Sequence, residues 1–350
     1  MPLERYQNGT GSGVLVVPNV NAGESRVSQE IATRFNTRLP KSTLIQFNDV
    51  IENPGVLKNK SMIVGIGGDL THATLVKLAH GVNPQVLYLA ADGGTFATFS
   101  GILGLKRWPR IRPDTYTDHL ADDMSSGRMH VIKIKPGRAM GDLKPALENI
   151  EIPHQTGDFL FTAGKGALAD RLWRIELVPR KSEEQRLKRI IQLLKQYGVS
   201  IKNSAPFSVK LGRSTYEVLD ANILKQPLNQ IGFLSLPHHD KDVLLAILNN
   251  DKVVLINRLV LDMLLNILHL PYLAHSFQVL PIEENQNIIF PDKQDETGNN
   301  LIHIDSLPFY NKGQFSALPS PSPTSTDYKL LTRRSPKFKR DEVIFSNDRS

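Results

Sequence analysis

A repeated order of apolar run, turn and helix-like segment in the first hundred residues constrains the fold of this chain most. Apolar, β-branched runs predict strands at residues 14–17, 43–47, 62–66 and 85–90. Between them, Ser25 and Thr71 are suited to cap helices whose apolar residues recur at near-helical spacing. Because strands that alternate with helices form parallel sheets covered by helices, we expect a doubly wound parallel α/β domain.

The pattern changes at about residue 129. Short strands separated by turn residues are predicted at 129–135, 158–162, 207–211, 216–219, 230–236 and 278–282. This spacing is typical of an antiparallel β-sandwich, here interrupted by two predicted helices at 182–197 and 254–268. We therefore expect a flexible N-terminus over residues 1–12, the α/β domain over 13–127 and the β-sandwich domain over 128–310.

Composition narrows the class of protein. The 350 residues include no cysteine, which excludes disulfides, thiolate zinc sites and a cysteine nucleophile and favours a reducing compartment. The N-terminus lacks the layout of a signal peptide, so we expect a cytoplasmic protein. The longest apolar stretch, residues 253–273, contains charged and amide side chains, and no transmembrane segment is expected.

The net charge of +7 is concentrated at the C-terminus. Residues 311–350 contain eight Lys and Arg against four Asp and Glu, a net charge of +4. Because residues 316–326 are rich in Ser and Pro, we expect a disordered basic tail over 311–350. The rest of the chain is only mildly basic, and aromatic residues make up 7% of the chain, so no nucleic-acid partner is expected.

Two glycine clusters each follow a predicted strand and precede a predicted helix. They are Gly65-Ile66-Gly67-Gly68-Asp69-Leu70-Thr71 and Asp92-Gly93-Gly94-Thr95, the latter continuing to Gly101. Glycine lets a backbone approach a phosphate, and a helix N-terminus offers free N–H groups to it. The alternative is that the glycines serve tight turns and packing only. Side by side at the carboxyl edge of a sheet, the clusters favour a ligand site.

The order of these residues resembles the diacylglycerol kinase catalytic-domain family, which includes bacterial lipid kinases and sphingosine kinases and is more distantly similar to NAD kinases. Residues 18–23 stand in the place of the family's first loop, and residues 67–71 in the place of its Gly-Gly-Asp motif. Residues 93–100 stand in the place of the family's Gly-Thr-Gly motif. Residues 158–166 look like a strand and turn of the family's second domain.

The resemblance implies ATP-dependent phosphorylation of the hydroxyl of a diacylglycerol- or sphingoid-type lipid, with the nucleotide between the two domains. Asp69 would hold Mg²⁺ or the acceptor hydroxyl, and Glu296 would be the general base. The nucleotide would be contacted by Asn21, Gly67, Gly68, Thr71, Gly93, Gly94 and Thr95.

Several residues depart from the family pattern at these places. Leu70 replaces a glycine, Phe96 and Ala97 replace an Asn-Asp pair, and Gln294 occupies the place of the late glutamate. A catalytically inactive nucleotide- or lipid-binding protein is therefore an alternative, and an NAD kinase-like enzyme is a further one. An enzyme acting on lipid would work peripherally at the inner face of the membrane, and a homodimer is compatible with the sequence.

Overall fold

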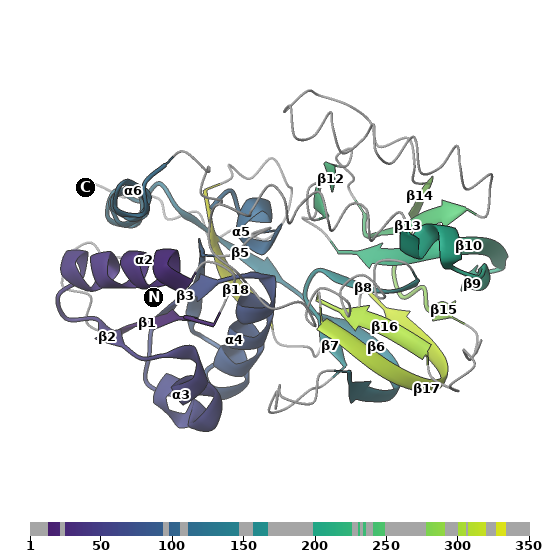
Figure 1. The fold of residues 1–350 in the computed structure, drawn as a ribbon, viewed down its shortest axis with the longest axis horizontal. Helices are drawn as coiled ribbons and strands as arrows, with labels where there is room; N and C mark the ends of the chain where they lie inside the picture. Colours follow the sequence, from purple (N-terminus) through teal and green to yellow (C-terminus); the bar gives the residue numbers. More distant parts are fainter. Residues whose placement is uncertain are drawn as a thin grey trace. The chain divides into compact units, whose positions relative to one another are not determined.

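The computed structural model describes residues 13–21, 25–93, 98–105, 111–146, 157–166, 199–225, 230–231, 234–235, 241–248, 278–290, 300–305, 307–319 and 327–333 (Figure 1). They divide into two compact units. The first unit runs to Ile134 and includes residues 327–333, and the second runs from Lys135 to Pro319. The division lies at Ile134 rather than at residue 127, because the strand that ends there belongs to the first unit's sheet.

The first unit contains a six-stranded sheet in the order β2-β1-β3-β4-β18-β5. Its strands are β1 (Val14–Pro18), β2 (Thr43–Leu44), β3 (Met62–Gly67), β4 (Leu87–Asp92), β5 (His130–Ile134) and β18 (Tyr328–Thr332). All neighbours are parallel except β18 and β5. The predicted parallel α/β architecture is confirmed. The second strand is shorter than predicted, because a helix begins at Phe47.

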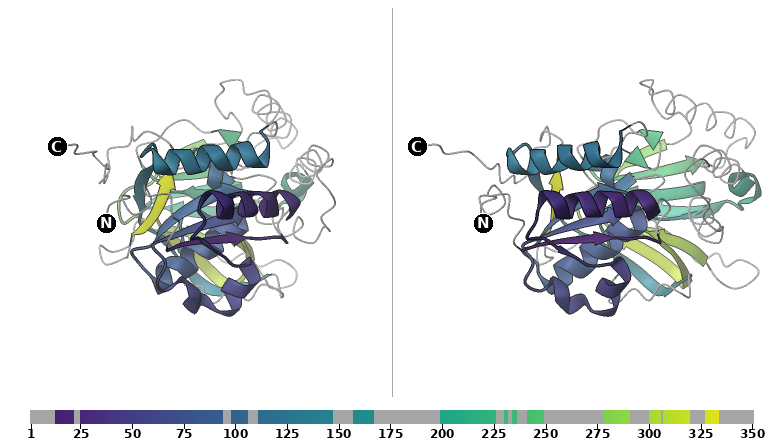
Figure 2. Two further views of the ribbon diagram at one scale, coloured as in Figure 1. Left: turned by 90° about the vertical axis from the view of Figure 1, so that its left-hand side faces the viewer. Right: turned by 60° about the vertical axis from the view of Figure 1, so that its left-hand side comes forward.

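Helices cover both faces of this sheet. They are α2 (Ser25–Arg38), α3 (Phe47–Glu52), α4 (Asp69–Val82), α5 (Thr98–Ile102) and α6 (Pro113–Ser125), with a 3-10 helix η1 (Pro54–Leu57). The β1-α2-β2 and β3-α4-β4 crossovers run in opposite directions across the sheet, so right-handed connections place α2 and α4 on opposite faces. Helices α2 and α6 lie side by side (Figure 2).

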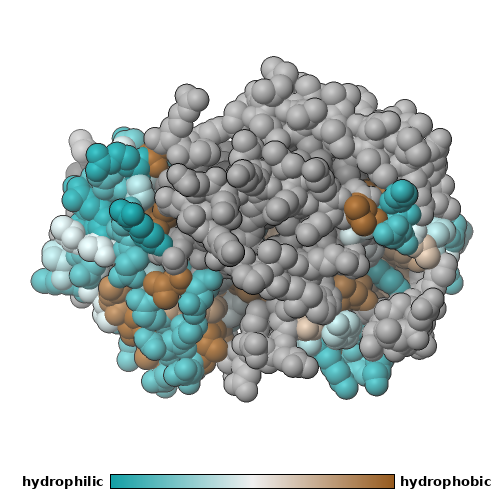
Figure 3. Space-filling view, in the orientation of Figure 1, coloured by the Kyte–Doolittle hydropathy of each residue, from teal (hydrophilic) through white to brown (hydrophobic). Residues whose placement is uncertain are grey.

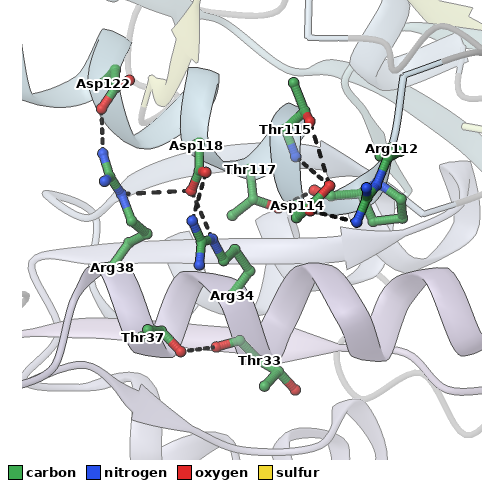
Figure 4. A network of polar contacts seen from close by, with 11 residues as sticks. Thr33, Arg34, Thr37, Arg38, Arg112, Asp114, Thr115, Thr117, Asp118 and Asp122 are labelled. Carbon is green, nitrogen blue, oxygen red and sulfur yellow. Dashed lines mark hydrogen bonds and ion pairs between the residues drawn. The ribbon is translucent and has the colours of Figure 1, made fainter.

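Ion pairs join α2 to α6 at the surface (Figure 4). Arg34 donates two hydrogen bonds, of 2.8 and 2.6 Å, to the carboxylate of Asp118. Arg38 contacts Asp118 at 3.7 Å and also pairs with Asp122. The hydrogen bond from Arg34 lowers the pKa of Asp118 below its usual value. These contacts orient α6 over the sheet, although exposed ion pairs stabilise a fold only modestly.

The strand β18 lies inside the first unit's sheet, between β4 and β5. Leu330 and Leu331 are fully buried, and Leu330 lies opposite Tyr88 of β4 and Ile132 of β5. The predicted disordered tail over 311–350 is therefore wrong for residues 311–319, which belong to or follow a strand of the second unit, and for 327–333. The Ser- and Pro-rich run before residue 327 and the charged residues around it favoured a disordered tail, so the five-residue strand was not predicted. Residues 334–350 lie outside the described residues.

A buried histidine of α4 holds β18. The backbone N–H of Lys329 donates to Nε2 of His80 at 2.8 Å, so Nδ1 carries the proton and donates to the Val76 carbonyl at 3.0 Å. The ring of Tyr328 lies 4.7 Å from the His80 ring, centroid to centroid. Burial lowers the pKa of His80 to about 4. The native structure therefore needs this imidazole to be neutral.

We expect the first unit to lose stability as the pH falls from about 6.5 to 4, because the unfolded state then binds a proton that native His80 excludes. The difference between a pKa of about 4 and one of about 6.5 corresponds to about 3 kcal/mol. His80→Gln should reduce this pH dependence without abolishing it, because buried His72 of the same unit also has a lowered pKa; His119→Gln, at an exposed position of α6, is the control. Urea unfolding followed across this pH range measures both slopes. An unchanged slope for His80→Gln would contradict the assignment.

The second unit is built from antiparallel strands. They are β6 (Gly137–Pro145), β7 (Asp158–Phe159), β8 (Thr162–Gly166), β9 (Phe207–Leu211), β10 (Ser214–Leu224), β11 (Gln230–Ile231), β12 (Leu234–Ser235), β13 (Val243–Leu248), β14 (Gln278–Pro281), β15 (Ile288–Phe290), β16 (Asn300–Ile304) and β17 (Leu307–Leu318). The main sheet runs β14-β13-β10-β8-β16-β17-β15-β9, and β9 pairs again with β10. The antiparallel pairing predicted for this region is confirmed, and its strands, predicted as a β-sandwich, form one closed circuit from β10 round to β9.

A buried aspartate fixes the β16–β17 turn. Asp305, with a φ of 48°, accepts hydrogen bonds through its carboxylate from the N–H groups of Leu160, Phe161 and Thr162 at 2.8–3.1 Å. Leu160 and Phe161 form the turn between β7 and β8, and Thr162 begins β8, so the single strand predicted over 158–162 is interrupted by a turn. The carboxylate accepts from these backbone N–H groups in place of the strand-pairing hydrogen bonds that are lost where the chain bends between β7 and β8.

Two predictions for the second half lie outside the described residues, namely the helices at 182–197 and 254–268. Strand β13 was not predicted, although its six residues are nearly all buried. Within the described part of the chain, no helix is long and apolar enough to span a membrane. On the surface that Figure 3 shows for described residues, hydrophilic and hydrophobic side chains are interspersed.

Candidate functional site

The order of strands in the first unit reverses between β1 and β3. The chain passes from β1 outward to β2 and returns past β1 to β3, so these two strands flank a topological switch point. In open α/β sheets, ligands bind outside the carboxyl ends of the strands at such a point. The segments that leave these ends are Asn19–Asn21 after β1 and Gly68–Asp69 after β3.

Asn19 joins these two segments. Its backbone N–H donates to the Ile66 carbonyl at 2.9 Å, and its Nδ2 donates to Oγ1 of Thr71 at 2.9 Å. Its Oδ1 accepts from the backbone N–H of Asn21 at 3.0 Å. Asn21, the residue predicted for this site, is exposed, and Asn19 was not predicted. The available signal was an Asn directly after a strand, a position that favours such a local turn.

Protein atoms account for three of the glycines. A Cβ on Gly67 would lie 2.6 Å from Oγ1 of Thr71, and one on Gly65 would collide with the Tyr88 hydroxyl. The N–H of Gly93 donates to the Gly67 carbonyl at 3.1 Å, and a Cβ on Gly93 would lie 3.1 Å from the Gly67 nitrogen. These glycines let β3, β4 and α4 approach one another closely. Packing explains them without a ligand.

Gly68 occupies a different position. It is the N-cap of α4, with extended backbone angles, and it provides no side-chain cap. Ser, Thr, Asp and Asn are the side chains that usually satisfy the first N–H groups of a helix. A glycine here gives this 14-residue helix no side-chain cap at its N-terminus, and the end of such a helix can bind an external anion through its free N–H groups. Thr71, which the sequence analysis gave as the cap, lies in the first turn and is buried.

Asp69 is the first residue of α4 and is half-buried. Its Oδ1 accepts a hydrogen bond from the backbone N–H of Phe99 in α5 at 2.8 Å. The carboxylate therefore connects the Gly-Gly-Asp turn to the helix that follows the second glycine cluster. Asp92, at the end of β4 and opposite Gly67, is a second carboxylate at this edge and is buried.

Leu70 fits its position without strain. It is the second residue of α4, and only Asn285 and Asp305 among the described non-glycine residues have a positive φ. The backbone at this position therefore does not require the glycine of the family pattern that Leu70 replaces. The other departures, at Phe96, Ala97 and Gln294, lie outside the described residues.

A buried polar layer lies beneath the turn. Nδ1 of His72 is 2.9 Å from the Tyr88 hydroxyl, and its Nε2 is 3.4 Å from Oγ of Ser100. Burial lowers the pKa of His72 to about 3 and raises that of Tyr88 well above its usual value. Both side chains are therefore neutral near pH 7. They support α4 and α5 from below and do not supply charge to the site.

Gly65→Ala should destabilise the first unit by about 1–3 kcal/mol, because the added methyl group collides with the Tyr88 hydroxyl in a packed core. Gly81→Ala is the matched control. A Cβ at that position of α4 has nothing within 4 Å, and alanine in a helix is favoured over glycine by up to about 1 kcal/mol. Thermal unfolding of both variants measures the difference. Equal melting temperatures would show that β3 and β4 are less closely packed than described.

Of the predicted site residues, Gly67, Gly68, Asp69 and Thr71 lie together on the β3–α4 turn, with Gly93 bonded to Gly67. The backbone N–H of Asn21 donates to Asn19, whose side chain in turn donates to Thr71 of this turn. Gly94, Thr95 and Glu296 lie outside the described residues. The metal assignment to Asp69 stays a prediction.

No family model and no curated protein matches the sequence. Among solved structures, a "putative diacylglycerol kinase" from Bacillus anthracis str. Sterne matches in two determinations. One has a TM-score of 0.54 at 12% identity over 91% of this chain and 96% of that chain, and the other 0.55 at 14% over 94% and 96%. A diacylglycerol kinase from the same organism gives 0.52 at 12% over 92% and 97%. At this identity the likeness shows that the fold is shared over most of the chain.

Proposed function

We propose that this chain, whose fold is that of the diacylglycerol kinase structures, is an ATP-dependent lipid kinase. In the proposed reaction, a lipid hydroxyl oxygen attacks the γ-phosphorus of ATP, the bond from that phosphorus to the bridging oxygen breaks, and ADP leaves. The hydroxyl proton passes to a general base, for which the sequence offers Glu296. The acceptor is a diacylglycerol- or sphingoid-type lipid, reached at the inner face of the membrane.

One observation supports this proposal most. The uncapped N-terminus of α4, at Gly68, lies at the topological switch point of the sheet, where Asn19 ties the β1 loop to Thr71. A helix N-terminus attracts phosphate through its free N–H groups and its dipole. The loop and the turn are already held in place, as phosphoryl transfer requires, because this reaction depends mainly on positioning.

The charges at this turn fit a nucleotide bound with a divalent cation. Asp69 would repel a bare phosphate next to it, and a carboxylate oxygen is a ligand that Mg²⁺ accepts in proteins. Asp69 would hold the ion, with Asp92 as the second carboxylate of the same edge. When bound, Mg²⁺ neutralises charge on the phosphates during transfer. Gly68 and the first turn of α4 bind and orient the phosphates.

A nucleotide- or lipid-binding protein without turnover is the second candidate. The packing roles of Gly65, Gly67 and Gly93 favour it, because those glycines need no phosphate to explain them. Phe96, Ala97 and Gln294 favour it as well, since they replace polar or acidic residues of the family pattern.

Transfer of labelled γ-phosphate from ATP with Mg²⁺ to a panel of lipids in mixed micelles tests the proposal. We expect label in diacylglycerol or a sphingoid base and not in lipids whose hydroxyl is blocked. NAD offered as the acceptor in the same panel tests the NAD kinase-like alternative. Binding of a fluorescent ATP analogue with no transfer to any acceptor would support the second candidate. Folded protein with neither binding of the ATP analogue nor transfer would overturn the kinase and the nucleotide-binding form of the second candidate.

A further inference from the structure

Helix α5 is too short to be stable on its own. It spans only Thr98–Ile102, and isolated helices shorter than about 12–15 residues are marginal in water. Its C-terminal end is closed locally, since Leu105 N–H donates to the Ser100 carbonyl at 2.7 Å and Gly104 has a φ of 68°. The position of α5 must therefore be fixed by contacts outside it.

The N-terminal part of α5 is held by α4. The N–H of Phe99 donates to Oδ1 of Asp69 at 2.8 Å, and the Phe99 ring lies 5.3 Å from the His72 ring. Oγ of Ser100 is 3.4 Å from Nε2 of His72. A shift of α5 would thus move the hydrogen-bond donor of the Asp69 carboxylate.

The C-terminal end of α5 is held by the end of β18. The Leu103 carbonyl, just after the helix, accepts from Oγ1 of Thr332 at 2.9 Å and from the N–H of Arg333 at 3.1 Å. Leu103 is fully buried and Thr332 nearly so. Arg333 also pairs with Asp123 of α6, which in turn accepts from Arg128 at 2.7 Å.

We infer that Thr332 and Arg333 are positioning residues for the proposed phosphate site. They clamp α5 through Leu103, and α5 in turn fixes the orientation of the Asp69 carboxylate. Three steps connect Thr332 to Asp69, more than 260 positions away in the sequence. Thr332 donates to Leu103, helix α5 leads from Leu103 back to Phe99, and Phe99 donates to Asp69. The link to catalysis rests on the proposed function, whereas the clamp itself does not.

The test compares Thr332→Val with Thr332→Ser and with Thr117→Val. Valine at 332 keeps the β-branched shape and removes the donor, whereas serine keeps the donor. Thr117 of α6 is also buried and donates its hydroxyl to the Pro113 carbonyl at 2.7 Å, so its valine variant loses a comparable bond elsewhere in the same unit. Arg333→Gln removes the ion pair with Asp123 and leaves the backbone bond to Leu103 intact.

Hydrogen exchange of the full chain, followed in peptides that cover residues 98–105, is the first readout. We expect Thr332→Val to speed exchange there roughly two- to tenfold, as expected for one lost hydrogen bond, with Thr332→Ser and Thr117→Val near wild type. The second readout is the KM for Mg·ATP, which should rise in Thr332→Val and return in Thr332→Ser.

Unchanged exchange in Thr332→Val, or the same increase in Thr117→Val, would overturn the clamp. The exchange result does not depend on catalysis. If wild-type protein transfers no phosphate and the exchange pattern is as expected, the proposed function fails and the clamp stands. If the protein transfers phosphate and neither exchange nor KM responds to Thr332→Val, the clamp fails and the proposed function stands.

Discussion

Asp69→Asn should reduce phosphate transfer to lipid by about 10²–10³-fold, the scale expected when a preorganised charged group at a transition state is removed. Asparagine retains an oxygen that can accept from the Phe99 N–H, so the α4–α5 contact is kept while the negative charge is lost. Thermal unfolding should therefore change little. The measurement is initial-rate transfer of labelled phosphate at saturating lipid, with Mg²⁺ varied.

Two further variants make this result specific. Asp69→Ala removes both the charge and the contact with Phe99, and it should lower activity and stability together. Asp49→Asn neutralises an exposed carboxylate in the first turn of α3 and should leave activity unchanged. Full activity in Asp69→Asn would show that the Asp69 carboxylate is not needed for phosphate transfer. Asp92 at the end of β4 would then be the candidate for its role.

The elements of the first unit that the sequence predicted well are those whose signals are local. The apolar runs at Val14–Val17 and Met62–Ile66 are β1 and β3, each with one residue added at its end. The turn Gly67–Thr71 was predicted because glycine favours a tight turn, and aspartate favours the start of a helix, at the junction of a strand and a helix. Such patterns depend on neighbouring residues only.

The contacts that the sequence did not predict are non-local. The position of Asn19 after a strand indicates a local turn, but its hydrogen bond to Thr71, 52 positions later, depends on how the two segments fold together. The packing of Gly65 against Tyr88 likewise needs the register of β3 and β4. Strand β18 has an ordinary strand sequence, yet its place in a sheet formed by residues more than 190 positions earlier cannot be read from the sequence around it.

Deleting residues 326–350 should prevent the first unit from folding. Strand β18 contributes three buried apolar side chains, Tyr328, Leu330 and Leu331, and each is worth about 1.5–3 kcal/mol when fully buried. Their sum is comparable with the whole stability of a typical domain, about 5–15 kcal/mol. The deletion also removes β18 as the described sheet partner of β5. It removes Lys329 as well, whose backbone N–H donates to His80.

Deleting only residues 334–350 is the matched comparison, since it retains β18 and the bonds of Thr332 and Arg333 to Leu103. We expect this shorter deletion to melt within about 2 °C of the full chain, because it removes none of the contacts described for the first unit. Circular dichroism and limited proteolysis of both deletions, with Leu330→Asp in the full chain, measure the effect. A disordered tail would tolerate all three changes equally, whereas an inserted strand tolerates only the deletion that begins after it.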